Sequence, residues 1–204
     1  DFLNLLLTNN YTDLKPGYAR YSPMCNENGG TVDDLIVYMK GENDYFVVVN
    51  ASNTDKDFAW MCDHKIDGVE VTNVSEQWGQ VALQGPNAEK ILAKVCEEKY
   101  IPAEYYSCIF DCEIKGIPCM ISRTGYTGED GFEIYMPADK AADMWELLIE
   151  NGEEFGLIPC GLGARDSLRM EAAMPLYGHE LTDEISPRTA GLGFAIKMDK
   201  DDFI

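Results

Sequence analysis

The sequence has few basic residues, few histidines and no long apolar run. Lysine and arginine number 16 against 36 aspartates and glutamates, which gives a formal charge of −20 at pH 7. Nucleic acids and anionic membrane surfaces both require clustered positive charge, so we expect neither as a partner. No apolar stretch reaches the length of a membrane span. A small anionic ligand is still possible, because one arginine in a cleft outweighs distant, screened surface charge.

The cysteines and histidines are too scattered to predict a metal site. The seven cysteines include no CxxC pair, and the closest two, Cys108 and Cys112, lie in a strand-like run. The chain has only two histidines, His64 and His179. A tetrahedral zinc site needs four such ligands close together, so we expect no metal. We interpret the cysteines as reduced, buried thiols of a cytoplasmic protein.

The sequence does contain enough apolar residues for a core, at 46% hydrophobic. Expected strands lie at 34–38, 45–50, 69–74, 78–84 and 131–136, with a further hairpin around 115–116. Expected helices lie at about 54–66, from 86 to 96, at 138–151 and at 162–173. Hairpin-paired strands that alternate with single helices predict an α+β fold with antiparallel sheets. Both ends interrupt an element, so we interpret the chain as an internal piece of a longer protein.

The segment from Cys25 to Tyr38 is more polar than packing alone requires. A glycine-containing loop delivers Asp33 and Asp34 into the start of an apolar strand, where alternation sends them to opposite faces. One of them therefore points inward, where an ionised carboxylate is costly unless hydrogen-bond donors bind it. The alternative is a pair of solvated acids on an edge strand.

A second unusual segment runs from Ser122 to Ile134. Three glycines surround Tyr126 and permit unusual backbone angles there. Glu133 follows in a strand, on the opposite face from its apolar neighbours. The pattern lacks the GK[ST] ending of a phosphate loop. A glycine-rich hairpin turn without a ligand is the alternative.

A third segment, residues 161–172, places two arginines one helical turn apart. Arg165 and Arg169 share a face from which Asp166 is absent, so simple pairing does not use both. An arginine near a helix N-terminus is poorly placed for the helix dipole, which favours an anionic partner from outside the helix. Ordinary solvated arginines are the alternative.

Together these segments resemble the aminomethyltransferase family, the T-proteins of the glycine cleavage system. The motifs that carry the resemblance run in order along nearly the whole chain: Asn26-Glu-Asn-Gly-Gly-Thr-Val-Asp-Asp-Leu-Ile-Val-Tyr38, Val48-Val-Asn-Ala51, Ala82-Leu-Gln-Gly-Pro86, Arg123-Thr-Gly-Tyr-Thr-Gly-Glu-Asp-Gly-Phe-Glu133, Gly161-Leu-Gly-Ala-Arg-Asp-Ser-Leu-Arg-Met-Glu171 and Leu176-Tyr-Gly-His-Glu-Leu181.

The resemblance implies a cloverleaf of three domains around a folate channel. Residues 1–76 are then expected to form a second α+β lobe with ferredoxin-like character. Residues 77–204 are expected to form the later part of the first, discontinuous lobe. The opening of that first lobe and a C-terminal β-barrel domain are expected to be absent from this chain, which is then truncated at both ends.

The resemblance also implies roles for single residues. Asp34 matches the family's catalytic carboxylate beside the reactive nitrogens of the pterin. Glu133 matches a carboxylate that hydrogen-bonds the pterin ring, and Arg165 matches a folate-contacting arginine. Further folate contacts are implied for Tyr21, Tyr126 and, on weaker matches, Tyr38 and Asn50.

The implied reaction transfers the methylene of an aminomethyl group, carried on the lipoyl arm of the H-protein, to tetrahydrofolate with release of ammonia. Tetrahydrofolate is the co-substrate, and no metal is implied. Three alternatives share parts of the pattern: a folate-binding module of a dimethylglycine- or sarcosine-oxidising enzyme, a folate-dependent iron–sulfur assembly relative, and a non-catalytic relative. The iron–sulfur relative carries a KGCYxGQE-type motif, which this sequence lacks.

Overall fold

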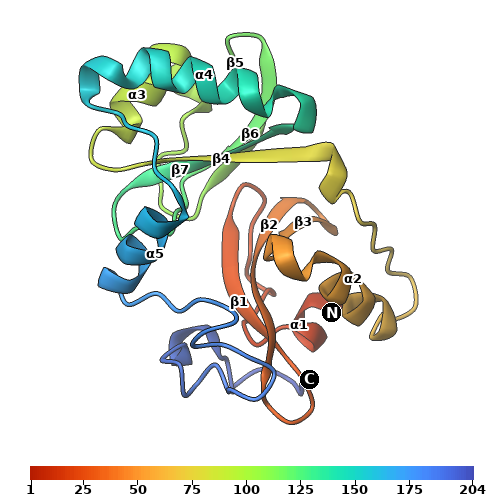
Figure 1. The fold of residues 1–204 in the computed structure, drawn as a ribbon. Coiled ribbons are helices and arrows are strands. Elements are labelled where there is room, and N and C mark those ends of the chain that lie inside the picture. Colours follow the sequence, from red (N-terminus) through yellow and green to blue (C-terminus); the bar gives the residue numbers. More distant parts are fainter. The chain divides into compact units, whose positions relative to one another are not determined.

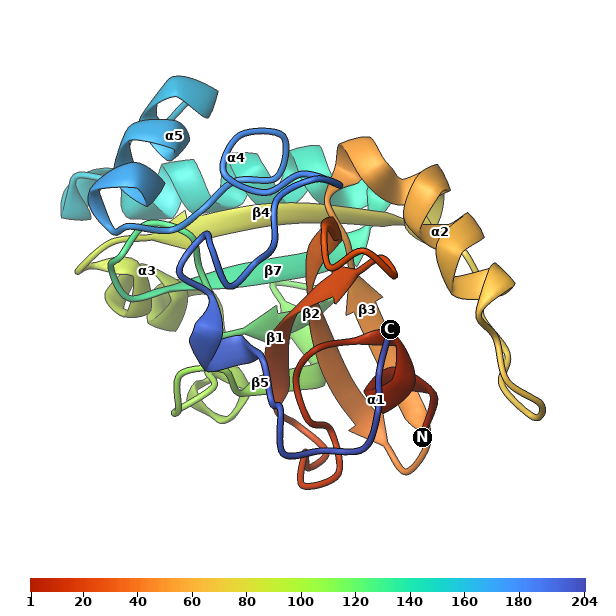
Figure 2. The same cartoon turned by 90° about the horizontal axis from the view of Figure 1, so that it is seen from below.

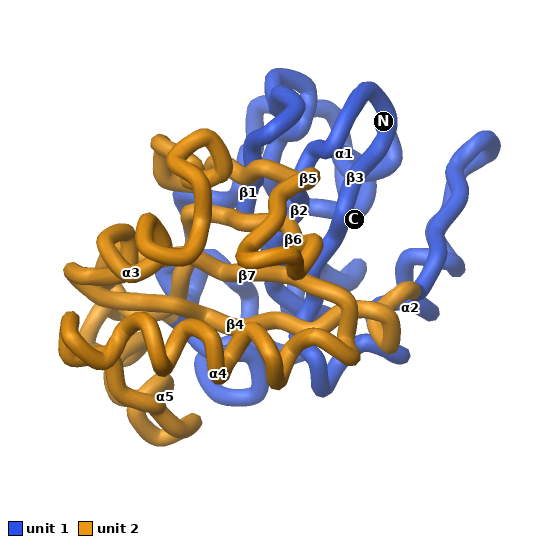
Figure 3. The backbone as a smooth tube through the Cα atoms, turned by 90° about the horizontal axis from the view of Figure 1, so that it is seen from above, with its two compact units in different colours: residues 1–73, 175–204 blue, residues 74–174 orange.

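The computed structural model describes residues 1–204, and they form two compact units (Figure 3). Unit 1 comprises residues 1–73 and 175–204, and unit 2 comprises residues 74–174. Each unit contains one antiparallel sheet, of three strands in unit 1 and four in unit 2, together with helices (Figure 1). The predicted α+β class is therefore confirmed. No helix combines the length and the apolarity that crossing a lipid bilayer requires.

Unit 1 is built on a sheet with the strand order β1-β2-β3. Its elements are α1 (Phe2–Leu6), β1 (Ala19–Cys25), β2 (Thr31–Gly41), β3 (Asp44–Val48), a 3₁₀ turn (Ala51–Asn53), α2 (Thr54–Asp63) and a second 3₁₀ turn (Gly193–Ala195). Alternation along β2 buries Leu35 and Val37 in a core that they share with Leu6, Leu7 and Met61. The β2–β3 pair is the predicted first hairpin.

The last segment of the chain, residues 175–204, packs with unit 1. The backbone N–H of Thr31 donates to the Thr182 carbonyl at 2.8 Å. The hydroxyl of Thr8 donates to the Ala195 carbonyl at 2.9 Å. At Gly30 a Cβ atom would lie 1.7 Å from the carbonyl oxygen of Asp183, so this approach requires glycine. The expected ranges 1–76 and 77–204 differ from this grouping at residues 74–76 and 175–204, and the assignment of either unit to a lobe stays a prediction.

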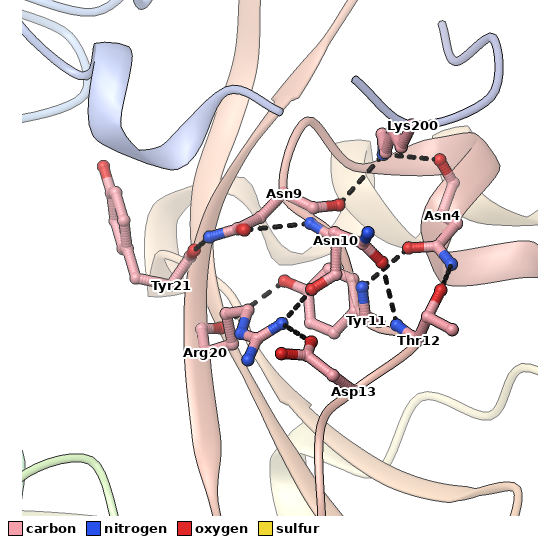
Figure 4. Close-up of polar contacts among 9 residues, drawn as sticks. All are labelled: Asn4, Asn9, Asn10, Tyr11, Thr12, Asp13, Arg20, Tyr21 and Lys200. Atoms are coloured by element: carbon pink, nitrogen blue, oxygen red, sulfur yellow. Dashed lines mark hydrogen bonds and ion pairs between the residues drawn. The ribbon is translucent and has the colours of Figure 1, made fainter. Parts of the chain in front are cut away.

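Lys200 connects the end of this segment to α1 and to the loop that follows α1 (Figure 4). Its ammonium donates to the carbonyls of Asn4 (2.6 Å), Asn9 (2.9 Å) and Leu7. The same loop holds β1, because the Asn9 side-chain amide donates to the Tyr21 carbonyl at 2.9 Å. The backbone of Tyr21 is thereby fixed from the loop side.

Unit 2 is built on a sheet with the strand order β4-β7-β6-β5. Its strands are β4 (Trp78–Gln84), β5 (Cys108–Ile114), β6 (Ile117–Ser122) and β7 (Gly131–Pro137); its helices are α3 (Ala88–Val95), α4 (Ala141–Gly152) and α5 (Leu162–Glu171), with 3₁₀ turns at Ser75–Gln77, Glu98–Tyr100, Ala138–Lys140 and Glu153–Phe155. Helices α3 and α4 cover one face of the sheet (Figures 1 and 2). Leu92, Phe132, Ile134 and Met144 lie in the core between them.

The hairpin predicted around 115–116 is confirmed as the β5–β6 pair. Lys115 and Gly116 both have positive φ, at 49° and 85°, as a tight two-residue hairpin turn requires. The strand predicted at 69–74 is wrong, because these residues belong to neither sheet. Strand β1 was not predicted. It contains Pro23, which weakens the strand signal in the sequence.

Three predicted helix boundaries need small corrections. Helix α2 ends at Asp63 rather than at about residue 66. Helix α3 begins at Ala88 after the N-cap Asn87, so Pro86 lies in the preceding turn. Helix α5 ends at Glu171 rather than 173. Such shifts are expected because apolar periodicity identifies the body of a helix better than its ends.

We predict that Lys200→Met lowers the free energy of unfolding by about 1–3 kcal/mol, because three carbonyls lose a charged donor while the aliphatic stem is kept. Urea denaturation measures this change. Lys197→Met, at an exposed position in the same segment, is the matched control and should stay within about 0.5 kcal/mol. Equal stability of the two variants would contradict the role given to Lys200.

Candidate functional site

Strand β2 carries two adjacent carboxylates in different environments. Asp33 is fully buried, whereas Asp34 is half-buried, so the predicted inward-facing member of the pair is Asp33. Asp33 Oδ1 accepts hydrogen bonds from the side-chain amides of Asn50 and Asn53, both at 2.8 Å. Asp33 Oδ2 accepts from the backbone N–H of Asn50 at 3.0 Å. These three donors compensate for the loss of water around a buried charge.

Asp34 lies on the other face of β2 and is held by two donors. The Tyr21 hydroxyl donates to Asp34 Oδ2 at 2.9 Å, and the Asn50 side-chain amide donates to Asp34 Oδ1 at 2.9 Å. Tyr21 reaches Asp34 because Tyr21 is paired with Ile36 across the β1–β2 ladder, two residues from Asp34 on the same face. Asn50 therefore contacts both carboxylates.

The environment of Asp34 makes it a stronger base than an exposed aspartate. Burial, followed by the negative charge of Asp33, raises the pKa of Asp34 to about 6, although the hydrogen bonds from Tyr21 and Asn50 act in the opposite direction. The carboxylate is thus mostly ionised at pH 7 and can still accept a proton. A group of this kind is suited to positioning and deprotonating a weakly basic nitrogen.

Three of the unit 1 residues proposed from the sequence, Tyr21, Asp34 and Asn50, are brought together by direct contacts. Tyr38 lies further along β2, fully buried, with its ring 6.3 Å from that of Phe46. Its predicted folate contact is untested. Asn53 was not predicted as a site residue, and its polar side chain at the start of α2 is the only signal for it in the sequence.

In unit 2, Glu133 is held on the polar face of β7. Its neighbours Phe132 and Ile134 are fully buried in the core, so the predicted alternation is confirmed. Gln80 of β4 donates to Glu133 Oε1 at 2.8 Å, and the Thr124 hydroxyl donates to Oε2. The carboxylate is therefore orientated by side chains from two other parts of the unit.

The two arginines of α5 have different environments. The Arg165 guanidinium lies 4.5 Å from the centre of the Tyr126 ring. Arg169 is buried, forms an ion pair with Asp166 at 2.8 Å and donates to the Met174 carbonyl at 3.1 Å. The expectation that simple pairing does not use both arginines agrees with this ion pair. Asp166 nevertheless reaches Arg169, because residues three apart also meet on a helix.

The three glycines around Tyr126 serve two purposes. Gly128 has φ 77°, which favours glycine, and a Cβ there would also lie 2.7 Å from that of Ala172. At Gly125 and Gly131, a Cβ would lie within 1.9 Å and 2.6 Å of the Gln84 side chain. Gln84 in turn donates to the Thr124 carbonyl at 3.1 Å, so these glycines admit a side chain that supports the loop.

The cysteines are all free, as expected. Five are buried, whereas Cys62 and Cys160 are exposed, so the expectation of burial is wrong for these two. No group of three or more histidine, cysteine or acidic side chains has a metal-binding arrangement.

The fold and these contacts define an α+β protein in which hydrogen-bond donors hold Asp33 and Asp34 in unit 1 and Glu133 in unit 2. The pKa of Asp34 is raised to about 6. A family model described as the GCVT N-terminal domain matches residues 1–200, and the chain belongs to this family. The resemblance to the aminomethyltransferases is thereby confirmed.

Curated relatives and a solved structure agree with this assignment. The chain is 54% identical over 204 residues to a protein from Halalkalibacterium halodurans named aminomethyltransferase, and covers 56% of it. It is 52% identical over 200 residues to the aminomethyltransferase of Geobacillus kaustophilus, with 98% of this chain and 55% of that protein covered. The crystal structure of glycine cleavage system aminomethyltransferase T from Bartonella henselae matches 97% of this chain and 52% of its own, at 34% identity and a TM-score of 0.81. The chain thus spans about half the length of these relatives.

We predict that Tyr21→Phe raises the pKa of Asp34 by about 1. The Tyr21 hydroxyl donates to the ionised carboxylate and stabilises it, and the variant loses this hydrogen bond. Carboxyl ¹³C NMR across a pH titration measures the change. Tyr45→Phe, at the other end of the β2–β3 hairpin, is the control and should leave the Asp34 titration near 6. An unchanged Asp34 titration in Tyr21→Phe would show that this hydrogen bond does not stabilise the charge.

Proposed function

We propose that this chain is the part of a glycine cleavage aminomethyltransferase that carries the catalytic carboxylate. The whole protein transfers the methylene of the aminomethyl-lipoyl arm of the H-protein to tetrahydrofolate and releases ammonia. The observation that carries the proposal is Asp34, half-buried, fixed by Tyr21 and Asn50, and with its pKa raised to about 6. The 54% identity to a named aminomethyltransferase supports the same reaction. We place the protein in the cytoplasm.

Asp34 acts on the folate nitrogen N5 in this proposal. N5 forms a bond to the methylene carbon as ammonia leaves. The bond from this carbon to the lipoyl sulfur then breaks as the folate nitrogen N10 forms the second bond. N5 and N10 each lose a proton, and these two protons end on the ammonia and on the released thiol. An ionised carboxylate held by two donors can position N5, stabilise positive charge that develops on it and accept the proton. Because Tyr21 and Asn50 already fix the carboxylate, little reorganisation is needed at the moment of transfer.

We assign the residues of unit 2 to recognition of the folate. A pterin presents ring nitrogens and an exocyclic amine along one edge, and Glu133 can accept hydrogen bonds from two of these groups. Tyr126 offers a flat face for the ring. Arg165, whose guanidinium lies against Tyr126, provides a positive charge for the carboxylates of the folate tail. Tyr38 is the weakest of the assigned contacts, since its ring is fully buried.

A folate-binding module of a dimethylglycine- or sarcosine-oxidising enzyme is the alternative function. Both functions bind tetrahydrofolate, so binding alone does not separate them. Release of ammonia from aminomethylated H-protein separates them, because only the aminomethyltransferase uses that donor. A non-catalytic relative that binds folate without either reaction would release no ammonia.

We predict that Asp34→Asn lowers turnover by roughly 10²- to 10⁴-fold and changes the affinity for tetrahydrofolate much less, because the shape is kept while the proton acceptor is lost. The measurement is ammonia release from aminomethylated H-protein by a polypeptide of the relatives' length that contains these residues. The ratio kcat/KM of the parent should fall below about pH 6, where Asp34 becomes protonated.

Asp44→Asn, at an exposed position on the same hairpin, is the control and should retain full turnover. If Asp33→Asn lowered turnover more than Asp34→Asn in protein that remains folded, the choice of Asp34 would be wrong.

We predict that Glu133→Ala and Arg165→Ala each weaken tetrahydrofolate binding by about 1–3 kcal/mol, as expected for a lost charged hydrogen bond. Isothermal titration calorimetry measures the loss. Glu129→Ala, at an exposed position of the same glycine-rich segment, is the control and should bind as the parent does. Negligible losses for both Glu133 and Arg165 would remove unit 2 from folate recognition.

A further inference from the structure

Asp57, in the first turn of α2, is a buried carboxyl group without a conventional partner. Its side chain is fully buried, and neither of its oxygens has a hydrogen-bond donor. Buried carboxylates are normally bound by donors or by cations, so an orphan of this kind requires an explanation. Asp57 belongs to none of the motifs that suggested the function.

The side chain of Asp57 faces the carboxyl group of Asp33 and interacts with it. Asn53 lies one helical turn before Asp57 and donates to Asp33 Oδ1 at 2.8 Å, so this face of α2 points at the Asp33 carboxylate. Asp33 Oδ1 accepts from two amides, whereas Oδ2 accepts only from the backbone N–H of Asn50. A lone pair of Oδ2 is therefore available for one further donor.

The remaining charges near Asp57 do not neutralise it. Lys56 is the next residue, but its ammonium donates to the Val32 carbonyl and, at 2.6 Å, to the Tyr177 hydroxyl. Asp34 adds a second negative charge. Burial first, and then the hydrogen bond and charge of Asp33, raise the pKa of Asp57 to about 9. Two carboxyl groups in such contact do not both ionise at neutral pH, so one proton is retained at Asp57.

We propose that Asp57 is a positioning residue whose protonated carboxyl group donates to Asp33 and so fixes the Asn50 amide against Asp34. The proton shared by Asp57 and Asp33 does not depend on the function proposed above, whereas its consequence for aminomethyl transfer does.

The hydrogen bond between Asp57 and Asp33 influences Asp34 through the side-chain amide of Asn50. The Asn50 amide has two hydrogens, which point to Asp33 Oδ1 at 2.8 Å and Asp34 Oδ1 at 2.9 Å. This orientation requires Asp33 to be an acceptor, and an ionised Asp33 is an acceptor only. By carrying the proton, Asp57 leaves Asp33 ionised and keeps the amide nitrogen, rather than its oxygen, turned toward Asp34.

The direct test is carboxyl ¹³C NMR of the parent chain with Asp57 assigned by comparison with Asp57→Asn. We expect Asp57 to show the chemical shift of a protonated acid at pH 7 and to titrate near pH 9. An ionised Asp57 at pH 7 would overturn the proposal.

Variants test the link to Asp34. Asp57→Asn retains a donor to Asp33, so the Asp34 titration should stay near pH 6. Asp57→Ala removes the donor and loosens Asn50, whose hydrogen bond lowers the pKa of Asp34, so that pKa should rise. Equal Asp34 titrations in the two variants would overturn the positioning role. Asp55→Asn, exposed on the same helix, is the matched control and should change neither titration.

Stability against pH gives a second readout that needs no ligand. The native state keeps the Asp57 proton above the ordinary aspartate pKa while the unfolded state releases it, so stability falls as the pH rises from about 4 to about 9. Asp57→Asn should show a shallower fall, and an unchanged slope would count against the proposal. If these results hold while Asp34→Asn leaves turnover intact, the shared proton stands and the proposed function fails.

Discussion

The burial of Asp33 is the constraint on which the rest of unit 1 depends. Strand alternation makes Asp33 face inward once Asp34 faces the other way, and a buried charge must then find donors within the fold. All three donors come from the segment that links β3 to α2, through Asn50 and Asn53. The position of that segment, and with it the start of α2, is therefore set by one carboxylate. Because its hydrogen bonds to Asp33 hold Asn50 in position, the Asn50 amide can also donate to Asp34.

The burial of Asp33 also shows how much of the candidate site could be predicted from the sequence. Alternation along β2 was enough to predict that one of two adjacent aspartates is buried, and the hairpin with β3 was predictable from two apolar runs around a turn. The donors were not predictable, since Asn50 and Asn53 lie 17 and 20 residues beyond Asp33 in the chain. The resemblance singled out Asn50 only as a folate contact, and nothing local in the sequence distinguishes Asn53 from an ordinary residue before a helix. The raised pKa of Asp34 was beyond reach for the same reason, because it depends on burial and on a neighbouring charge.

In unit 2, too, local sequence patterns predict which face of a strand a residue occupies but not its hydrogen-bond partners. The placement of Glu133 opposite two core residues follows from strand alternation, and the structure agrees. Its donors Gln80 and Thr124 are set by pairing between strands distant in sequence, which local patterns do not report. The glycine-rich segment was understood only in part. One glycine serves a left-handed backbone conformation, whereas Gly125 and Gly131 make room for Gln84, a close approach that only the packed structure reveals.

The carboxyl cluster of unit 1 opposes folding, and this has a bearing on its chemistry. A solvated aspartate has a pKa of about 3.9 and is a poor proton acceptor at neutral pH. Raising that value requires burial and like charge, and both destabilise the folded chain. The arrangement around Asp34 supplies them from Asp33, while the donors Tyr21 and Asn50 limit the rise to about 6, so that the group remains charged at neutral pH. Asp34 is thus a base of intermediate strength, because burial and the charge of Asp33 raise its pKa while the two donors lower it. Removing either the neighbouring charge or the donors would move this pKa away from the range in which the carboxylate is an effective proton acceptor.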